Sequence, residues 1–484
     1  MNIVEPILFQ ARYQPEAPAL CAQGDDIVSY AQLRTQMNNI ARRAMSFGLK
    51  PGNIVALAIV NPLHHTAVIL GLTQIGIIPM TVGPNAPPPR LKVDAVIKNT
   101  AYSFAPEAKH LQFDFTWMMG DGAPIEGSRD FRSDGDDICR IIMTSGTTGD
   151  PKAVALSHKV AIERIARFDF LTGHGLPRSS RVYLNMALGS ARGYYSLTYV
   201  LGRGGTLFFR GESLENTLRS FEVFRVETMM ATPRTLAQLL DACDRFPGFE
   251  VHFDTIISGG SQLPRPLLDR VWPKLCRNLV TVYGATETAL AATAPAQRIA
   301  DIPGAVGYVA PGARVEIVDQ ADNPVPDGTE GIVRVASECG VDRYIDDPEE
   351  SAKVFRDGWF YPGDLGSLTP DRLLIISGRQ RDLLNIGGGK MAATKIEAAL
   401  VSHRGVSEAG VFSATNRLGV EEVWAAIVCA ENVDSDSLRA HCRARMPPIF
   451  VPVHIVPVDA LVVNEMGKID RARLKENVMA AAMP

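Results

Sequence analysis

The stretch SYAQLRTQMNNIARRAMSFGLKPGNIVALAIV, residues 29–60, predicts the fold class of this chain. Ser29 and Gln32 have the spacing of a capping box, so we expect a helix to begin there. The apolar residues expected on the inner face of that helix are Leu33, Met37, Ile40 and Ala44. The segment GLKPG, residues 48–52, predicts the end of the helix and a turn, and the apolar run 54–60 then has the length of a buried parallel strand. A helix followed by a buried strand is typical of an α/β fold.

The same alternation continues along the chain. Asn61 and Pro62 predict the start of another amphipathic helix, and residues 77–82 predict the next strand. Further buried strands are expected at residues 138–143, 181–186, 205–209, 255–258 and 279–283. The repeated pattern indicates an α/β architecture with helices covering the sheets.

The texture of the sequence changes after about Pro303. Short β-branched runs there alternate with Asp-Asn, Pro-Asp-Gly and Gly turns, which predicts a β-rich subdomain, either a small barrel or a sheet. A charged elbow at residues 379–382 follows an apolar strand, and we place the domain boundary there. The predicted domains are residues 1–380 and 381–484, the second mixing helices with strands such as 423–430.

Size, charge and cysteine usage limit the classes of function. A chain of 484 residues exceeds what one hydrophobic core usually organises, so we expect a multidomain enzyme. The net charge of −4 and the absence of a long basic run argue against nucleic acid and favour small-molecule partners. Seven cysteines without a metal-ligand spacing suit a reduced cytosol. The N-terminus lacks the features of a signal peptide, and the apolar run 67–82 is too short to span a bilayer, so we expect a cytoplasmic protein.

The segment IIMTSGTTGDPKAVALSH, residues 141–158, places hydroxyl residues and glycines directly after an apolar run. Backbone N–H groups, hydroxyl donors and Lys152 in one short loop are the groups that bind a polyphosphate. The standard P-loop is not indicated, because Asp150 and Pro151 separate Gly149 from Lys152. An ordinary polar turn is the alternative at this point.

This loop, together with VYGATET (282–288), GWFYPGDLG (358–366), SGRQRDLL (377–384) and GKIDRARL (467–474), closely resembles the adenylate-forming superfamily. That superfamily comprises acyl-CoA synthetases, adenylation domains of peptide synthetases and luciferases. The resemblance implies a large N-terminal domain with αβαβα-type sheets and a small β-barrel-like subdomain, followed by a small, mobile α+β domain. It also implies two half-reactions. A carboxylate attacks the α-phosphate of ATP to give acyl-adenylate and pyrophosphate, and a thiol, that of CoA, then displaces AMP.

The resemblance assigns catalytic roles to three residues. The first half-reaction brings a carboxylate towards an anionic phosphate, so cations and fixed dipoles must stabilise the transition state. Lys468 matches the lysine that bridges the acyl oxygen and the α-phosphate. Glu287 matches the residue that holds Mg²⁺ on the phosphates, and Thr286 would donate to the α-phosphate. By residue type alone, Lys468 would be a solvated lysine and Glu287 a helix-start glutamate.

The nucleotide contacts follow in the same way. Asp364 matches the carboxylate that accepts both ribose hydroxyls, and Arg379 matches an arginine on the ribose; turn composition and solvation are the alternatives. The residues expected around the pyrophosphate are Thr144, Ser145, Gly146, Thr147, Thr148, Gly149 and Lys152, with Thr148 joining Glu287 at the metal. Those expected around the adenine are Ser258, Gly259, Gly260, Tyr283 and Gly284, where Tyr283 either stacks on the base or is a core tyrosine.

The thiol half-reaction requires a domain rotation in this superfamily. The hinge lies two residues after the ribose arginine, which is Arg381 here, where many relatives have Asp or Lys. The glycines expected to let the pantetheine arm pass close to the backbone are Gly387, Gly388 and Gly389. A flexible turn is the alternative, so the triple glycine favours a thiol acceptor without proving one.

The sequence departs from the superfamily pattern in the segment expected to line the acyl pocket. Residues 183–197 contain neither the histidine of many acyl-CoA synthetases nor the aspartate of amino-acid-activating relatives, so amino acids are disfavoured. Arg192 is unusual there: in the pocket it would pair with a second carboxylate or polarise a carbonyl, and otherwise it lies on the surface or binds phosphate. Pro362 replaces a commoner threonine and removes a hydroxyl near the nucleotide. Candidate pocket walls are Gly189, Arg192, Tyr194, Met230, Ala231, Gly260 and Ala285.

Three functions are compatible with these residues. The first is an AMP-forming acyl-CoA ligase that uses ATP, Mg²⁺ and CoA on a small carboxylic acid. The second is an acyl-AMP ligase or stand-alone adenylation enzyme that loads a phosphopantetheinyl carrier protein. The third is a non-catalytic relative that binds a nucleotide or an acyl ligand, against which Lys468 argues, since a binding protein has no need of it. The expected assembly is a monomer or a homodimer.

Overall fold

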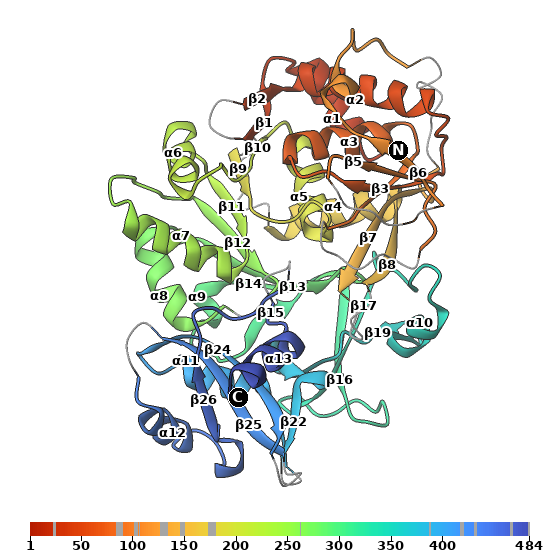
Figure 1. Ribbon diagram of the computed structural model, residues 1–484. Helices are drawn as coiled ribbons and strands as arrows, with labels where there is room; N and C mark the ends of the chain where they lie inside the picture. Colours follow the sequence, from red (N-terminus) through yellow and green to blue (C-terminus); the bar gives the residue numbers. More distant parts are fainter. Residues whose placement is uncertain are drawn as a thin grey trace.

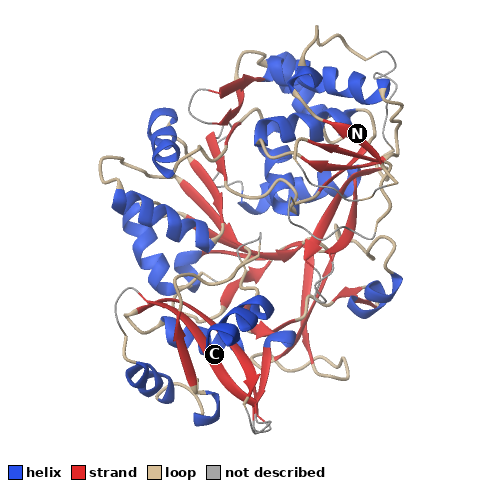
Figure 2. Cartoon of the chain, in the orientation of Figure 1, coloured by secondary structure: helices blue, strands red, loops and turns tan. Residues whose placement is uncertain are grey.

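The computed structural model describes residues 1–22, 26–83, 91–100, 105, 107–125, 134–145, 151–172, 181–261, 263–386, 389–416, 421–429, 433–464 and 468–482. Within these residues the chain forms two large sheets covered by helices, and a smaller α+β part at the C-terminal end (Figures 1 and 2). Figure 1 places α11 (Ala393–Val401), α12 (Ser435–Arg443) and α13 (Arg471–Ala482) at the opposite end of the molecule from the first helices of the chain.

The first sheet follows the predicted alternation. Its order is β6-β5-β3-β4-β7-β8, in which all neighbours are parallel except the antiparallel pair at β7 and β8. The bounds are β3 (Ile54–Ala58), β4 (Ile78–Thr81), β5 (Ala95–Lys98), β6 (Lys109–Gln112), β7 (Ile138–Ser145) and β8 (Pro151–Ser157). The strands expected at residues 54–60, 77–82 and 138–143 are therefore confirmed within a few residues.

The second sheet joins the parallel strands of the middle of the chain to the β-rich segment after Pro303. Its order is β18-β19-β17-β20-β21-β15-β14-β13-β12-β11-β9-β10-β1-β2, with β16 paired to β17. The bounds are β1 (Pro18–Ala22), β2 (Asp26–Ser29), β9 (Arg181–Leu184), β10 (Thr206–Phe208), β11 (Thr228–Ala231), β12 (Thr255–Gly259), β13 (Leu279–Ala285), β14 (Ala289–Pro295), β15 (Ala305–Val309), β16 (Ala313–Val318), β17 (Gly331–Ser337), β18 (Phe355–Arg356), β19 (Trp359–Phe360), β20 (Asp364–Leu368) and β21 (Leu373–Arg379). The predicted β-rich segment thus continues the same hydrogen-bonded sheet.

Helices pack on both sheets. Their bounds are α1 (Glu5–Tyr13), α2 (Tyr30–Ser46), α3 (Pro62–Gln74), α4 (His158–Thr172), α5 (Ala191–Gly202), α6 (Leu214–Phe224), α7 (Pro233–Arg245), α8 (Arg265–Lys274), α9 (Ala296–Ile299) and α10 (Pro348–Val354), with a 3-10 turn at Phe115–Met118. The capping box at α2 is confirmed, because Ser29 accepts from Gln32 N and the Gln32 side chain accepts from Ser29 N. Leu33, Met37, Ile40 and Ala44 are fully buried, as expected.

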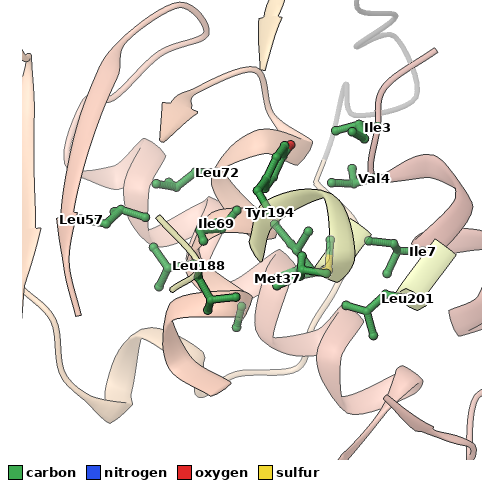
Figure 3. Packing of buried hydrophobic residues seen from close by; sticks show 14 of the residues in the cluster. Ile3, Val4, Ile7, Met37, Leu57, Ile69, Leu72, Leu188, Tyr194 and Leu201 are labelled. Atoms are coloured by element: carbon green, nitrogen blue, oxygen red, sulfur yellow. The ribbon is translucent and has the colours of Figure 1, made fainter. Parts of the chain in front are cut away.

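The helix that begins at Pro62 differs from its prediction. An amphipathic helix was expected, but α3 is buried on nearly all sides, including the polar Thr66, Thr73 and Gln74. It packs against α2 and the first sheet, in the interior of the largest core (Figure 3). A helix enclosed on all faces has no solvent side, so its polar positions gave a misleading signal.

The 3-10 turn Gln380–Asp382 follows β21 at the charged elbow, where we predict the domain boundary, and the C-terminal part of the chain comes after it. That part contains the hairpin β22 (Leu383–Ile386) and β23 (Gly389–Ala392), a three-stranded sheet and the helices α11 to α13. The bounds of that sheet are β24 (Val406–Thr415), β25 (Glu421–Cys429) and β26 (His454–Pro457), and a further 3-10 turn spans Pro448–Phe450. The strand expected at residues 423–430 corresponds to β25.

The two parts touch at Gly378. A Cβ built on this glycine would lie 2.4 Å from Ala392 Cβ and 2.9 Å from Thr394 Oγ1. Thr394 Oγ1 donates to Ser377 O, and Lys395 pairs with Glu330 nearby. Small residues and one exposed ion pair therefore make this contact.

All seven cysteines are free, as expected for a chain without a disulfide framework. Among the described residues, no helix combines the length and the apolar character that crossing a bilayer requires.

Candidate active site

Asp364 and Arg379 lie opposite each other in neighbouring antiparallel strands, β20 and β21. Arg379 Nε is 2.8 Å from Asp364 Oδ1, and Arg379 Nη1 donates to Pro362 O. Tyr283, on β13, donates its hydroxyl to Asp364 Oδ2 at 2.6 Å. Three residues that the sequence assigned to the nucleoside are thus in direct contact, although Tyr283 stands 81 positions before Asp364.

The Asp364 carboxylate is buried, and each of its oxygens has a protein partner, Arg379 at Oδ1 and Tyr283 at Oδ2. Burial and the neighbouring carboxylate raise the pKa of the Tyr283 hydroxyl well above its usual value, which keeps it a hydrogen-bond donor. A vicinal diol needs two acceptor lone pairs on such a carboxylate. The geometry places the carboxylate where Tyr283 and Arg379 fix its orientation.

Glu287 and Thr286 occupy the turn between β13 and β14, and Arg164 of α4 holds that turn. Arg164 donates from Nη1 to Thr286 O at 2.7 Å and from Nη2 to Glu287 O at 3.2 Å. It also donates to Cys339 O and to the Tyr195 hydroxyl. A buried guanidinium with four oxygen partners fixes the backbone from which Thr286 and Glu287 project.

The carboxylate of Glu287 is 6% exposed and accepts a hydrogen bond from Tyr344 to Oε1 at 2.8 Å. Burial raises its pKa above the ordinary value, while the Tyr344 hydroxyl acts in the opposite direction. A buried carboxylate with one oxygen fixed by a tyrosine fits a Mg²⁺ ligand, since Mg²⁺ takes few protein carboxylates and shares substrate phosphates. Thr148, the other residue expected at the metal, lies outside the described residues.

Lys152, on β8, contacts two carboxylates of the α10 region. Its Nζ is 2.9 Å from Asp347 Oδ2 and 3.7 Å from Glu350 Oε2, and the side chain is 5% exposed. Thr144 Oγ1 donates to Lys152 O across the β7–β8 hairpin. Ser145 ends β7, and the intervening Gly146, Thr147, Thr148 and Gly149 lie outside the described residues. The predicted phosphate lysine is therefore at the base of the loop, with an acidic partner.

The residues assigned to the adenine lie at the carboxyl ends of parallel strands, where ligands of open α/β sheets bind. Ser258 and Gly259 end β12, and Gly260 follows with a φ of +96°, which favours glycine. Gly284 lies at a bulge of β13, where an added Cβ would be 2.0 Å from Ala289 O. Successive residues of a strand face opposite sides of the sheet, so Ser258 and Gly259 lie toward different sides.

Arg192, in the first turn of α5, is half-buried. A Cβ at Gly259 would lie 2.5 Å from Arg192 Nη1 and 2.8 Å from Nη2, so the guanidinium lies against the end of β12. Nη1 is buried without a hydrogen-bond partner among the described residues. Arg192 as a whole is half-buried, with the Nη1 end of its guanidinium enclosed, and its role stays a prediction.

The other residues expected in the acyl pocket lie in or beside the core. Tyr194 is 1% exposed, its ring lies beneath the Arg140 guanidinium, and Figure 3 shows it among apolar side chains. Met230 and Ala231, on β11, are also buried, and Gly189 approaches Thr81 closely. Ala285 ends β13 beside the site. The pocket assignment of these residues stays a prediction.

Lys468 lies just before α13, in the C-terminal part. Its backbone N–H donates to Asn464 Oδ1, and its carbonyl accepts from Asn464 N. Arg381 lies in the 3-10 turn at the predicted boundary, and Gly389 begins β23. Gly387 and Gly388 lie outside the described residues. The catalytic and hinge roles of this part of the chain stay predictions.

Sequence reasoning missed Arg164, Tyr344 and Asp347, each of which holds an assigned residue. Arg164 and Tyr344 contact the Glu287 turn from 123 and 57 positions away. Asp347 contacts Lys152 from 195 positions away. Only the run DDPEES, residues 346–351, offered a local signal, that of a helix start rich in acidic residues.

Comparisons with known proteins agree with this geometry. The family described as AMP-binding enzyme matches residues 8–345, and the family described as AMP-binding enzyme C-terminal domain matches residues 395–468. A 4-chlorobenzoate–CoA ligase of Arthrobacter sp. is 25% identical, covering 99% of this chain and 95% of that protein. A fatty acid–[acyl-carrier-protein] ligase, ScoC, of Streptomyces coeruleorubidus is also 25% identical, covering 98% and 96%.

Among solved structures, an O-succinylbenzoate Coenzyme A synthetase of Bacillus subtilis in complex with ATP and magnesium ion is similar in fold. Its TM-score is 0.82 at 20% sequence identity, over 97% of this chain and 99% of that chain. The mixed α/β fold, with a large N-terminal part and a small C-terminal part, is that of adenylate-forming enzymes.

Proposed function

This chain belongs to the AMP-binding enzyme family, and from that premise we propose that it is an ATP-dependent, AMP-forming acid–thiol ligase. It activates a carboxylic acid to an acyl-adenylate with release of pyrophosphate and transfers the acyl group to the thiol of CoA. The observation that carries the proposal is the contact of Tyr283, Asp364 and Arg379, since it supports a ribose site beside the Glu287 turn.

The residues of this chain take the following parts in the first half-reaction. Asp364, oriented by Tyr283 and Arg379, accepts the ribose hydroxyls and fixes the α-phosphate relative to Thr286. A carboxylate oxygen of the acid forms a bond to the α-phosphorus, and the bond from that phosphorus to the bridging oxygen of pyrophosphate breaks. Lys468 offsets the charge that develops on the α-phosphate, and Lys152 binds the leaving pyrophosphate.

Glu287 would be a ligand of Mg²⁺ together with Thr148. The ion supplies charge neutralisation on the phosphates. Arg164 and Tyr344 keep the Glu287 carboxylate in place for it.

In the second half-reaction a thiolate attacks the acyl carbonyl carbon, and the bond to the phosphate oxygen of AMP breaks. We assign residues 1–380 and 381–484 to the two domains and the hinge to Arg381, with Gly387, Gly388 and Gly389 along the pantetheine path. The contact at Gly378 supports this division, because small residues and one exposed ion pair are what have to separate there when the domains rotate.

The acceptor has two candidates, CoA and a carrier protein. The similarity to a CoA ligase favours CoA, and the similarity to ScoC keeps a phosphopantetheinyl carrier as the alternative. Comparing product formation with CoA and with a loaded carrier protein separates them. A monomer or homodimer stays our prediction, which light scattering of the purified chain checks.

Exchange of labelled pyrophosphate into ATP over a broad acid panel tests the activity directly. We expect exchange with at least one acid class, and we expect Lys468→Ala to lower its rate by about a hundredfold or more. Lys475→Ala, an exposed lysine on α13, is the matched control. Background exchange with every acid would favour the non-catalytic alternative, and full activity of Lys468→Ala would remove the role assigned to that lysine.

A further inference from the structure

The Arg192 guanidinium occupies space that a side chain at position 259 would need. Arg192 follows the N-cap Ser190 of α5, and Gly259 ends β12. An added Cβ at Gly259 would be 2.5 Å from Arg192 Nη1. Glycine at position 259 therefore lets the guanidinium approach the carboxyl end of β12.

The charge of Arg192 has no partner among the described residues. Nη1 is buried and makes no hydrogen bond, and no charged side chain among the described residues acts on Arg192. Burial lowers the pKa of Arg192 to about 10, and no neighbouring charge offsets that effect. A charged N–H group that is buried without an acceptor costs stability, so an anion that binds to Nη1 would relieve the penalty.

Two other buried arginines of the same region provide a comparison. Arg164 donates to four oxygens, and Arg140 Nη2 donates to Thr81 Oγ1 and Leu188 O above the Tyr194 ring, while Arg140 Nε and Nη1 are buried without a partner among the described residues. These two side chains hold elements of the fold together. Arg192 differs from both because it has neither a hydrogen-bond partner nor a charged partner among the described residues.

Arg192 also lies on the side of α5 that faces the candidate active site. Residues three apart lie on one face of a helix, so Arg192 and Tyr195 share a face. The Tyr195 hydroxyl accepts from Arg164, which also binds the Thr286 carbonyl. Gly259 pairs in register with Val282, the residue before Tyr283. The guanidinium thus lies against Gly259, on the strand next to the one that carries Tyr283.

We propose that Arg192 binds a second carboxylate of the acid substrate, so that this chain activates dicarboxylic acids. The inference rests on the proposed function and names its substrate class. A guanidinium matches a planar carboxylate with two parallel hydrogen bonds, and the N-terminal end of α5 adds a favourable dipole. One carboxylate reacts at the α-phosphate while the other stays on Arg192. A monocarboxylic acid of the same length leaves the guanidinium unpaired and is disfavoured.

The test compares acids of equal carbon number in ATP–pyrophosphate exchange. The pairs are malonate and propionate, succinate and butyrate, glutarate and pentanoate, and terephthalate and 4-methylbenzoate. For the best pair we expect the wild type to prefer the dicarboxylate by about a hundredfold in kcat/KM. Arg192→Gln should lower kcat/KM for the dicarboxylate by a similar factor, mainly through KM, and leave the monocarboxylate unchanged or improved. Arg203→Gln, at the other end of α5 and paired with Asp169, is the control.

Wild-type exchange that favours monocarboxylates overturns the inference and leaves the proposed function standing. Equal loss for both acids in Arg192→Gln also overturns it, since a structural arginine would behave in that way. Background exchange with every acid is a failure of the proposed function instead.

A stability measurement decides the role of Arg192 independently of turnover. We expect the preferred dicarboxylate at millimolar concentration to raise the thermal midpoint of the wild type and not that of Arg192→Met. Because the buried charge is uncompensated without ligand, Arg192→Met should itself have a midpoint equal to or above that of the wild type. A lower midpoint together with an unchanged response to the dicarboxylate overturns the proposal.

Discussion

Lys152 and Asp347, 195 positions apart, form an ion pair of 2.9 Å between the base of the glycine-rich loop and the start of α10. The cation that we assign to pyrophosphate therefore has a carboxylate partner within the protein. ATP has to compete with that carboxylate, which sets up the first prediction.

Asp347→Asn should lower KM for ATP by about three- to tenfold, because it removes the Asp347 negative charge that competes with phosphate for Lys152. Asparagine keeps the N-cap of α10, where Asp347 Oδ1 now accepts from Glu350 N, so the helix should remain intact. Initial rates at varied ATP concentration measure the effect, with Asp346→Asn as the neighbouring control. An unchanged or higher KM would mean that Asp347 positions Lys152 and does not compete with phosphate.

Tyr283→Phe should raise KM for ATP by about five- to tenfold, because Asp364 loses the donor that orients it. Asp364→Asn should have a larger effect, of about a hundredfold in kcat/KM, since the amide places a donor where the ribose needs an acceptor. Tyr361→Phe, which removes a hydroxyl bound to Arg334, is the control. Comparing ATP with 3′-deoxy-ATP checks the assignment: the two variants should discriminate between these nucleotides less than the wild type does.

The dependence of Mg²⁺ activation on pH should report Glu287. Burial raises the pKa of this carboxyl, so Mg²⁺ competes with a proton and half-saturation needs more metal as the pH falls through the raised pKa. The Tyr344 hydrogen bond acts against that rise. Tyr344→Phe should therefore move the transition to a higher pH, and Glu287→Gln should abolish it.

Titration of Mg²⁺ activation at several pH values measures this shift, with Tyr361→Phe as a control for the loss of a hydroxyl elsewhere. A transition in Tyr344→Phe that stays in place or moves to a lower pH would contradict the role of this hydrogen bond.

Arg164→Ala should reduce the free energy of unfolding by about 3 kcal/mol and lower kcat, because four buried oxygens lose a charged donor. Arg167→Ala, one turn along α4 with more exposed contacts, is the control and should cost less stability. Urea denaturation and pyrophosphate exchange on the same samples measure both effects. Unchanged kcat in a destabilised Arg164→Ala would show that Arg164 supports the fold and not the Thr286–Glu287 turn.

Sequence patterns that span only a few residues predicted most of the fold. The Ser29–Gln32 capping box and the strand runs are local, since a few neighbouring residues determine them. Contacts between distant residues were not accessible in this way. The pairing of Lys152 with Asp347 and the burial of Arg192 against Gly259 depend on which strand ends meet, which periodicity does not encode. The motif resemblance assigned the residues of the site, and their supporting contacts emerged only from the structure.

A larger side chain at Gly378 would separate β21 from the C-terminal part of the chain. Because a Cβ at this position would collide with Ala392, Gly378→Val should displace the C-terminal part from β21. The substitution replaces none of the residues assigned to ATP. Distances between spin labels on the two parts would measure this displacement directly. If the displaced arrangement supports only one of the two half-reactions, adenylation and thiol transfer can be measured separately in this variant.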